Sequence, residues 1–117
     1  MSNKLNIDLD AANAELKDKS AEDIVAWALQ HANNPIITTN FRPYESVILH
    51  MVAKQRPDIT VLFVDSGYNT EATYRHAMDL IKRLNLNVVT YLPQQTAAWR
   101  DVHFNGIPSV NNPAHAE

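Results

Sequence analysis

Apolar and polar positions along the chain form two kinds of pattern that alternate. Residues 35–40, 60–64 and 87–92 each predict a strand, and the continuous apolar run at 60–64 is the clearest of the three. Between them, apolar residues recur at helical spacing from Pro43 to about Lys54 and again after Thr70. The order strand, helix, strand, helix, strand favours parallel pairing with right-handed crossovers. We therefore predict an α/β fold of three layers, with a three-stranded parallel sheet and helices on both faces.

Further helical patterns flank this central unit. Residues 8–17 predict a short helix, and Ser20 predicts the N-cap of a second helix that ends before Pro35. A last short helix is expected over about residues 94–102. The predicted organisation is an N-terminal helical segment (1–34), a βαβαβ core (35–104) and a linker-like tail (105–117).

Composition limits the chemistry that this chain can perform. The net charge of −3 gives no reason to expect binding to nucleic acid or to an anionic membrane. There is no apolar run near the roughly 20 residues of a transmembrane helix and no signal-peptide pattern, so we expect a cytoplasmic protein. The absence of cysteine excludes cysteine nucleophiles and thiolate metal sites within these 117 residues. Two glycines are too few for a Gly-rich phosphate loop, and the histidines lack metal-ligand spacing.

The residues after the first two predicted strands are the candidate binding residues. In an open parallel sheet, ligands bind beyond the carboxyl ends of the strands. The first such segment, 38–43, leads into a helix N-terminus, where backbone N–H groups and the helix dipole attract anions. Arg42 adds a cation that can grip phosphate or sulfate, and Asp65-Ser66-Gly67 follows the second strand. Taken singly, these residues also have ordinary explanations as helix caps, a plain turn and a solvated charge.

Together, the segments resemble the phosphoadenylyl-sulfate (PAPS) reductase family in one order and spacing. The resemblance is carried by Thr38-Thr39-Asn40-Phe41, Val47-Ile48-Leu49-His50, Arg56-Pro57-Asp58-Ile59, Val64-Asp65-Ser66-Gly67-Tyr68, Glu71-Ala72-Thr73-Tyr74-Arg75, Leu84-Asn85-Leu86-Asn87-Val88 and Ala97-Ala98-Trp99. It implies the adenine nucleotide alpha hydrolase-like (Rossmann-like) fold, with residues 35–104 as the nucleotide-binding core. It also implies binding of PAPS and its reduction to sulfite with electrons from thioredoxin or glutaredoxin, as in assimilatory sulfate reduction and cysteine biosynthesis.

The resemblance assigns two segments to the nucleotide site. Thr39, Asn40, Phe41 and Arg42 would lie in a modified phosphate-binding loop, with Thr38 before it, and Asp65, Ser66 and Gly67 would lie beside the nucleotide. The family usually has glycine where Arg42 stands. If that position needs a positive φ, Arg42 is strained; otherwise it supplies an extra cation. The expected ligand is PAPS or adenosine 3′,5′-bisphosphate, and no cofactor or metal is expected.

A larger departure is the absence of the family's nucleophile, a cysteine in a motif near the far end of a chain about twice as long. No catalytic residue is therefore assigned in this chain. We interpret it as a truncated or short form that keeps the nucleotide-binding half, so that thioredoxin or glutaredoxin would be partners only if a catalytic half is present. The alternatives are a non-catalytic nucleotide-binding module and a structural or pairing remnant.

One edge of the predicted sheet, along residues 35–40, would have no neighbouring strand. The segment is apolar and carries no charge that would block association. Three explanations stay open. The edge pairs with another chain to form a homo-oligomer, it is covered by the N-terminal helices or the tail, or the chain is a fragment.

Overall fold

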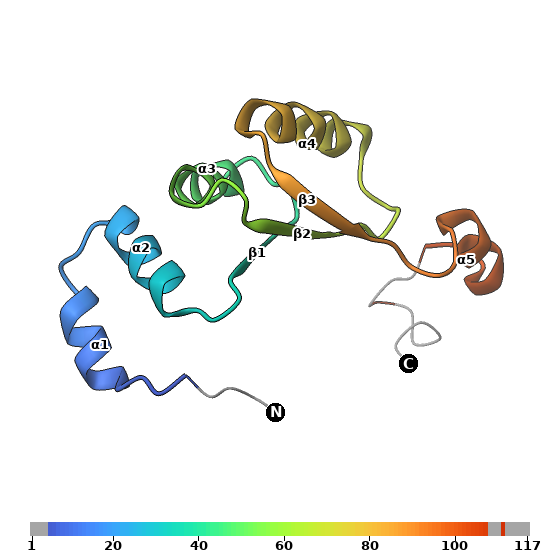
Figure 1. Cartoon of the computed structure of the whole chain (residues 1–117). Helices are drawn as coiled ribbons and strands as arrows, with labels where there is room; N and C mark the ends of the chain where they lie inside the picture. Colours follow the sequence, from blue (N-terminus) through green and yellow to red (C-terminus); the bar gives the residue numbers. More distant parts are fainter. Residues whose placement is uncertain (1–4, 108–110, 112–117) are drawn as a thin grey trace.

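The computed structural model describes residues 5–107 and 111. Its elements follow the predicted alternation of helices and strands (Figure 1). In chain order they are α1 (Leu9–Leu16), α2 (Ala21–His31), β1 (Ile36–Thr39), α3 (Glu45–Gln55), β2 (Thr60–Val64), α4 (Glu71–Leu84), β3 (Asn87–Tyr91) and α5 (Ala97–Phe104). The strands form one parallel sheet in the order β1-β2-β3, so the predicted α/β fold class is confirmed.

Helix boundaries are set by local capping. The Ser20 hydroxyl accepts the Asp23 N–H at 3.1 Å, as predicted for the start of α2. The last helix is shifted from the predicted 94–102, because the Thr96 hydroxyl caps α5 by accepting the Trp99 N–H at 3.1 Å. Pro43 lies in the turn before α3 and not in its first turn, since the helix begins at Glu45.

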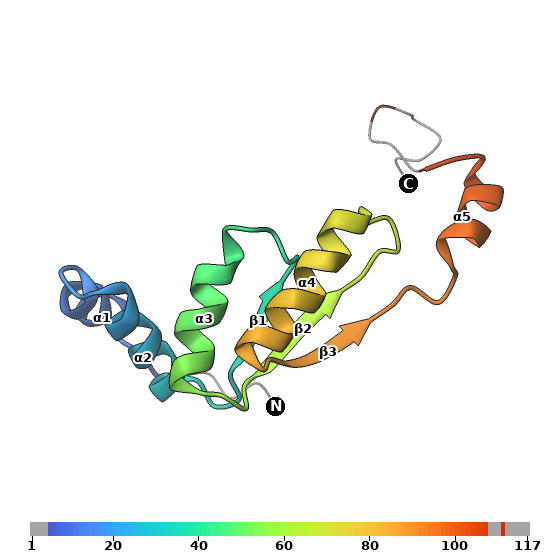
Figure 2. The same ribbon diagram turned by 90° about the horizontal axis from the view of Figure 1, so that it is seen from above.

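One face of the sheet forms the main core. Parallel register places Ile37 beside Val61 and Val61 beside Val88. These side chains pack with residues of α3 and α4, and both helices lie on this side of the sheet (Figure 2). The buried members of the cluster are Phe41, Leu49, Val61, Phe63, Ala77, Leu80 and Leu86.

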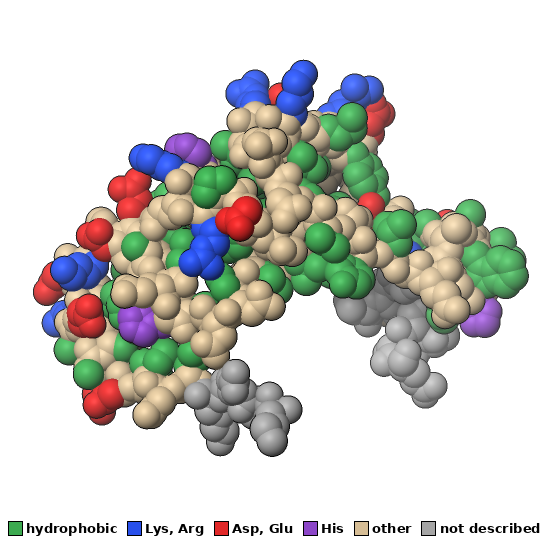
Figure 3. Space-filling view, viewed as in Figure 1, with side chains coloured by type: hydrophobic (Ala, Val, Ile, Leu, Met, Phe, Trp, Pro, Cys, Tyr) green, Lys and Arg blue, Asp and Glu red, His purple; other side chains and the backbone are tan. Residues whose placement is uncertain are grey.

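The opposite face of the sheet keeps apolar side chains in solvent. Ile36, Val64, Val89 and Tyr91 are 52%, 63%, 40% and 60% exposed. Figure 3 shows hydrophobic side chains on the side of the sheet away from α3 and α4. Parallel sheets usually have both faces covered, and the sequence predicted helices on both. In residues 5–107, however, α3 and α4 both pack on one face and leave this face open.

β1 lies at one edge of the sheet, as predicted. α2 flanks this edge, where Val25 packs with Val52 of α3 and Ile59, and Ile37 contacts the same cluster. An apolar groove of about 300 Å³ remains between α2, β1 and α3. Helix α2 therefore packs beside part of β1, while Ile36 stays exposed.

No helix in residues 5–107 is long and apolar enough to span a bilayer. Of the predicted tail, the structure describes only residues 105–107 and 111; the rest of that prediction lies outside the described residues.

Candidate functional site

The loop between β1 and α3 is held by hydrogen bonds within the chain. The hydroxyl of Thr39, a residue only 6% exposed, accepts the Phe41 N–H at 2.9 Å and donates to Glu45 Oε2 at 2.6 Å. The Asn40 N–H donates to the same Glu45 oxygen at 2.8 Å. The N–H groups of Asn40 and Phe41 are therefore not free to bind an anion in this structure, contrary to the expectation from the sequence.

The unusual backbone conformation of this loop falls on Phe41 and not on Arg42. Phe41 has φ +55°, while Arg42 is not among the described residues with positive φ. A bulky residue in the left-handed region costs about 1–3 kcal/mol. Burial offsets this cost, because Phe41 is 1% exposed and its ring meets Phe63 edge-on at 5.0 Å. Arg42 is thus an unstrained, exposed cation.

The loop after β2 is organised by the Asp65 carboxylate. Its Oδ1 atom accepts the Gly67 N–H at 2.8 Å, the Asn69 side-chain amide at 3.1 Å and the Tyr74 hydroxyl at 2.8 Å. Gly67 has φ +82°, a conformation that L side chains rarely adopt. Asp65 therefore fixes the turn and the start of α4. Its Oδ1 atom makes all three of these contacts within the chain.

Helix α5 supports the same loop from its outer side. The Tyr68 hydroxyl donates to Asp101 Oδ1 at 2.9 Å, and Arg100 donates to the Ser66 carbonyl. The Arg100 guanidinium also lies 4.8 Å from the centroid of the Tyr68 ring. These contacts connect α5, late in the chain, to the loop after β2. Burial raises the pKa of the Tyr68 hydroxyl, and its hydrogen bond to Asp101 raises it further.

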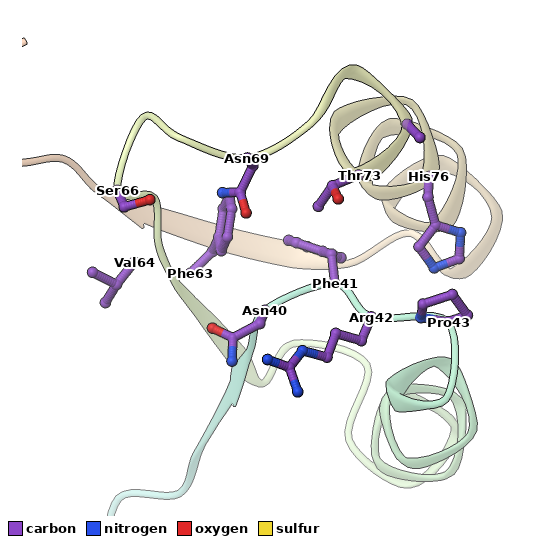
Figure 4. A pocket seen from close by; sticks show the side chains of 11 residues that line it. Asn40, Phe41, Arg42, Pro43, Phe63, Val64, Ser66, Asn69, Thr73 and His76 are labelled. Carbon is purple, nitrogen blue, oxygen red and sulfur yellow. The ribbon is translucent and has the colours of Figure 1, made fainter. Parts of the chain in front are cut away.

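A pocket of about 490 Å³ opens between the two loops and the first turns of α4. Figure 4 shows Asn40 and Arg42 extending from the β1–α3 loop, with Thr73 and His76 on α4 across from them. The pocket is lined by Asn40, Phe41, Arg42, Pro43, Phe63, Val64, Ser66, Asn69, Ala72, Thr73 and His76. This described lining contains one guanidinium, several hydrogen-bonding side chains and no carboxylate.

The two carboxylates nearest the loops favour their ionised forms. Desolvation raises the pKa of Glu45, but bonds from the Thr39 hydroxyl and the N–H groups of Asn40 and Arg42, with the Arg42 charge, lower it below its ordinary value. Desolvation likewise raises the pKa of Asp65, and its hydrogen bonds bring it below its ordinary value. Both groups are therefore anions at neutral pH.

The structure distributes the predicted binding residues among different positions. Asn40, Phe41, Arg42 and Ser66 line the pocket. Thr39, Asp65 and Gly67 are engaged inside the two loops. Thr38 lines a separate hollow of about 140 Å³ together with Thr39, Asn40, Glu45, Leu62 and Val64.

Sequence reasoning missed the pocket residues on α4 and in the segment that leads into it. Asn69, Thr73 and His76 all line the pocket. Thr73 and His76 are three residues apart on one face of α4, a signal that was present in the sequence, while Asn69 precedes the helix. His76 Nε2 is a buried atom with no hydrogen-bond partner among the described residues. Glu45 was also missed, because its role depends on the loop's hydrogen bonds.

The parallel sheet and the pocket at its strand ends define an α/β protein whose pocket lies where open parallel sheets bind their ligands. Residues 34–111 match the phosphoadenosine phosphosulfate reductase domain. The chain therefore belongs to the phosphoadenosine phosphosulfate reductase family, and the resemblance noted in its sequence is confirmed.

Two curated relatives illustrate the similarity. The phosphoadenosine 5′-phosphosulfate reductase of Xanthomonas euvesicatoria pv. vesicatoria is 44% identical over 114 residues, covering 90% of this chain and 47% of the relative. The reductase of the same name from Xylella fastidiosa is 38% identical over 110 residues, covering 89% and 46%. The chain thus spans about half the length of the curated relatives it matches.

A solved structure supports the fold independently. The PAPS reductase from Candida auris, determined as a phosphate complex, superposes with a TM-score of 0.77 at 21% identity. The similar region covers 88% of this chain and 51% of that chain.

Proposed function

We propose that this chain binds PAPS or adenosine 3′,5′-bisphosphate in the pocket between the β1–α3 loop and α4. In this proposal it corresponds to the nucleotide-binding half of a PAPS reductase. Family membership supports the ligand class, and the position of the pocket at the carboxyl ends of β1 and β2 supports the site.

The observation that carries this proposal is the chemistry of the pocket lining. Arg42 supplies a permanent positive charge, and Asn40, Ser66, Asn69 and Thr73 supply hydrogen-bonding groups. The described lining has no carboxylate. An anionic ligand in this pocket is therefore attracted by Arg42 and is not repelled by a lining side chain. We assign Asn40, Phe41, Arg42 and Ser66 as contacts, with Thr38, Thr39, Asp65 and Gly67 shaping the surrounding loops.

The redox step of PAPS reduction would need a group from outside this chain. Reduction to sulfite with thioredoxin or glutaredoxin is expected only when a catalytic half with the nucleophilic cysteine is present. The 117 residues contain no cysteine, so they cannot by themselves form a cysteine S-sulfo intermediate. This observation favours the non-catalytic nucleotide-binding module as the second candidate. The cellular context of either candidate would be cytoplasmic sulfate assimilation and cysteine biosynthesis.

Calorimetric titration of the purified chain with PAPS, adenosine 3′,5′-bisphosphate and ATP tests the proposal. Arg42→Ala is expected to weaken binding of adenosine 3′,5′-bisphosphate about tenfold or more, since charge-assisted hydrogen bonds contribute about 1.5–3 kcal/mol. Arg83→Ala is the matched control, because Arg83 lies in the last turn of α4 and pairs with Asp79 at 2.9 Å.

The outcomes separate the candidates. Binding of PAPS that Arg42→Ala weakens and Arg83→Ala does not would support the site. Thioredoxin-dependent sulfite release by the chain alone would contradict the role assigned to a separate catalytic half. The absence of binding by any nucleotide at millimolar concentration would refute both nucleotide-binding candidates.

We also propose a homo-oligomer that forms through the β1 edge. The support is the absence of a neighbouring strand on the outer side of β1 in the described sheet and the 52% exposure of Ile36. Light scattering after gel filtration is expected to give a dimer or larger, and Ile36→Lys is expected to give a monomer. A wild-type chain that stays monomeric at all accessible concentrations would rule this out.

A further inference from the structure

The β1–α3 loop already holds an anion, and that anion is the carboxylate of Glu45. Its Oε2 atom accepts the Asn40 N–H at 2.8 Å and the Thr39 hydroxyl at 2.6 Å. Glu45 is the first residue of α3, at the positive end of the helix dipole. Successive N–H groups around a left-handed residue such as Phe41 form a concavity that suits anions. The chain thus supplies, from its own sequence, the type of group that this loop attracts.

The Glu45 carboxylate lies next to the pocket assigned to the nucleotide. It lines the smaller hollow of about 140 Å³. Asn40 and Val64 line both this hollow and the larger pocket, so the two share a wall. A nucleotide in the larger pocket could therefore direct an anionic group over Asn40 and toward the position that Glu45 occupies.

We propose that Glu45 is a specificity-determining residue that competes with an anionic group of the ligand for the N–H of Asn40. This inference rests on the proposed nucleotide site. The Asn40 N–H beside the smaller hollow is then a phosphate contact, and the Glu45 carboxylate occupies it when no ligand is bound. A phosphate must displace the carboxylate or bind beside its charge, so Glu45 weakens anionic ligands selectively. Neutral adenosine has no anionic group to bind this N–H, so Glu45 does not change its affinity.

The test replaces Glu45 with glutamine, which keeps the side chain's length but removes its charge. A neutral amide oxygen competes less well, because charge-assisted hydrogen bonds are roughly twice as strong as neutral ones. Glu71→Gln is the matched control, since Glu71 is likewise the first residue of its helix, α4, but pairs with Arg75 at 2.5 Å outside the pocket lining. Both variants change the net charge equally.

Calorimetry with adenosine 3′,5′-bisphosphate and with adenosine gives the deciding comparison. Glu45→Gln is expected to lower the Kd for the bisphosphate about tenfold, while Glu71→Gln changes it less than about twofold. The Kd for adenosine is expected to stay the same in both variants. A purely structural role for Glu45 would weaken both ligands together. That result, or equal effects of the two variants on the bisphosphate, would overturn the proposal.

A second measurement keeps this inference separable from the proposed function. Amide NMR titration with inorganic phosphate follows the Asn40 N–H directly. We expect it to respond at lower phosphate concentration in Glu45→Gln than in the wild-type chain, and an equal response would overturn the role of Glu45. If no nucleotide binds either protein, the proposed function fails, and the phosphate titration alone decides whether Glu45 competes for this loop.

Discussion

The Thr39 hydroxyl is the point at which the stability of the β1–α3 loop can be tested most directly. Thr39→Val keeps the shape of the side chain but removes its hydroxyl. The Phe41 N–H, which donates to that oxygen at 2.9 Å in a buried position, would lose its partner, and Glu45 would lose a donor at 2.6 Å. An unsatisfied buried donor costs about 1–3 kcal/mol, and the lost bond to the partly buried carboxylate adds about 1 kcal/mol.

We therefore expect Thr39→Val to lower the free energy of unfolding by about 2–4 kcal/mol. Urea denaturation followed by circular dichroism measures this change, provided that the m value is preserved. Thr39→Ser is the control, because it keeps the hydroxyl and loses only a methyl group, at a cost of about 1 kcal/mol. If the valine variant is within about 0.5 kcal/mol of the wild-type chain, the loop does not depend on this hydroxyl.

Three further predictions concern stability and follow from single features of the fold. Leu49→Ala is expected to lower the free energy of unfolding by about 3 kcal/mol in the same assay, because Leu49 is 1% exposed in the main core; a loss below about 1 kcal/mol would contradict that packing. Asn85 has φ +50° at the end of α4, so Asn85→Ala should cost about 1 kcal/mol and Asn85→Gly should not destabilise the chain. The pKa values of Glu45 and Asp65 lie below their ordinary 4.5 and 3.8, so their stabilising effect is present above these values. The urea midpoint should fall as the pH drops through this range toward the lower folded-state values, and a midpoint that does not change with pH would be inconsistent with the assigned hydrogen bonds.

Most of the fold was predictable because its signals are local. The apolar run 60–64 became β2 with the predicted bounds. The helical pattern after Thr70 became α4, and the Thr70 hydroxyl caps it by accepting the Thr73 N–H at 3.3 Å. The exact starts of α3 and α5 were not predictable. Pro43 is compatible with a turn as well as with the first turn of a helix, and Thr96 caps α5 although the predicted helix began near residue 94.

The site was predictable as a region but not atom by atom. The rule that ligands bind beyond parallel strands identified the two loops. Which side chains face the pocket depends on tertiary contacts that a single sequence does not display. The positive φ falls on Phe41 because that ring is buried against Phe63, and Asp65 turns toward Tyr74 instead of the pocket.

Chemical-shift mapping of the amide NMR spectrum with adenosine 3′,5′-bisphosphate tests the central claim most directly. The account predicts saturable shifts clustered at the pocket, at the amides of Asn40, Arg42, Ser66, Asn69 and Thr73. The amides of α1 and of the last turn of α4 should stay unchanged. Shifts confined to other surfaces, or no shifts at millimolar nucleotide, would contradict the assignment of this pocket as the nucleotide site.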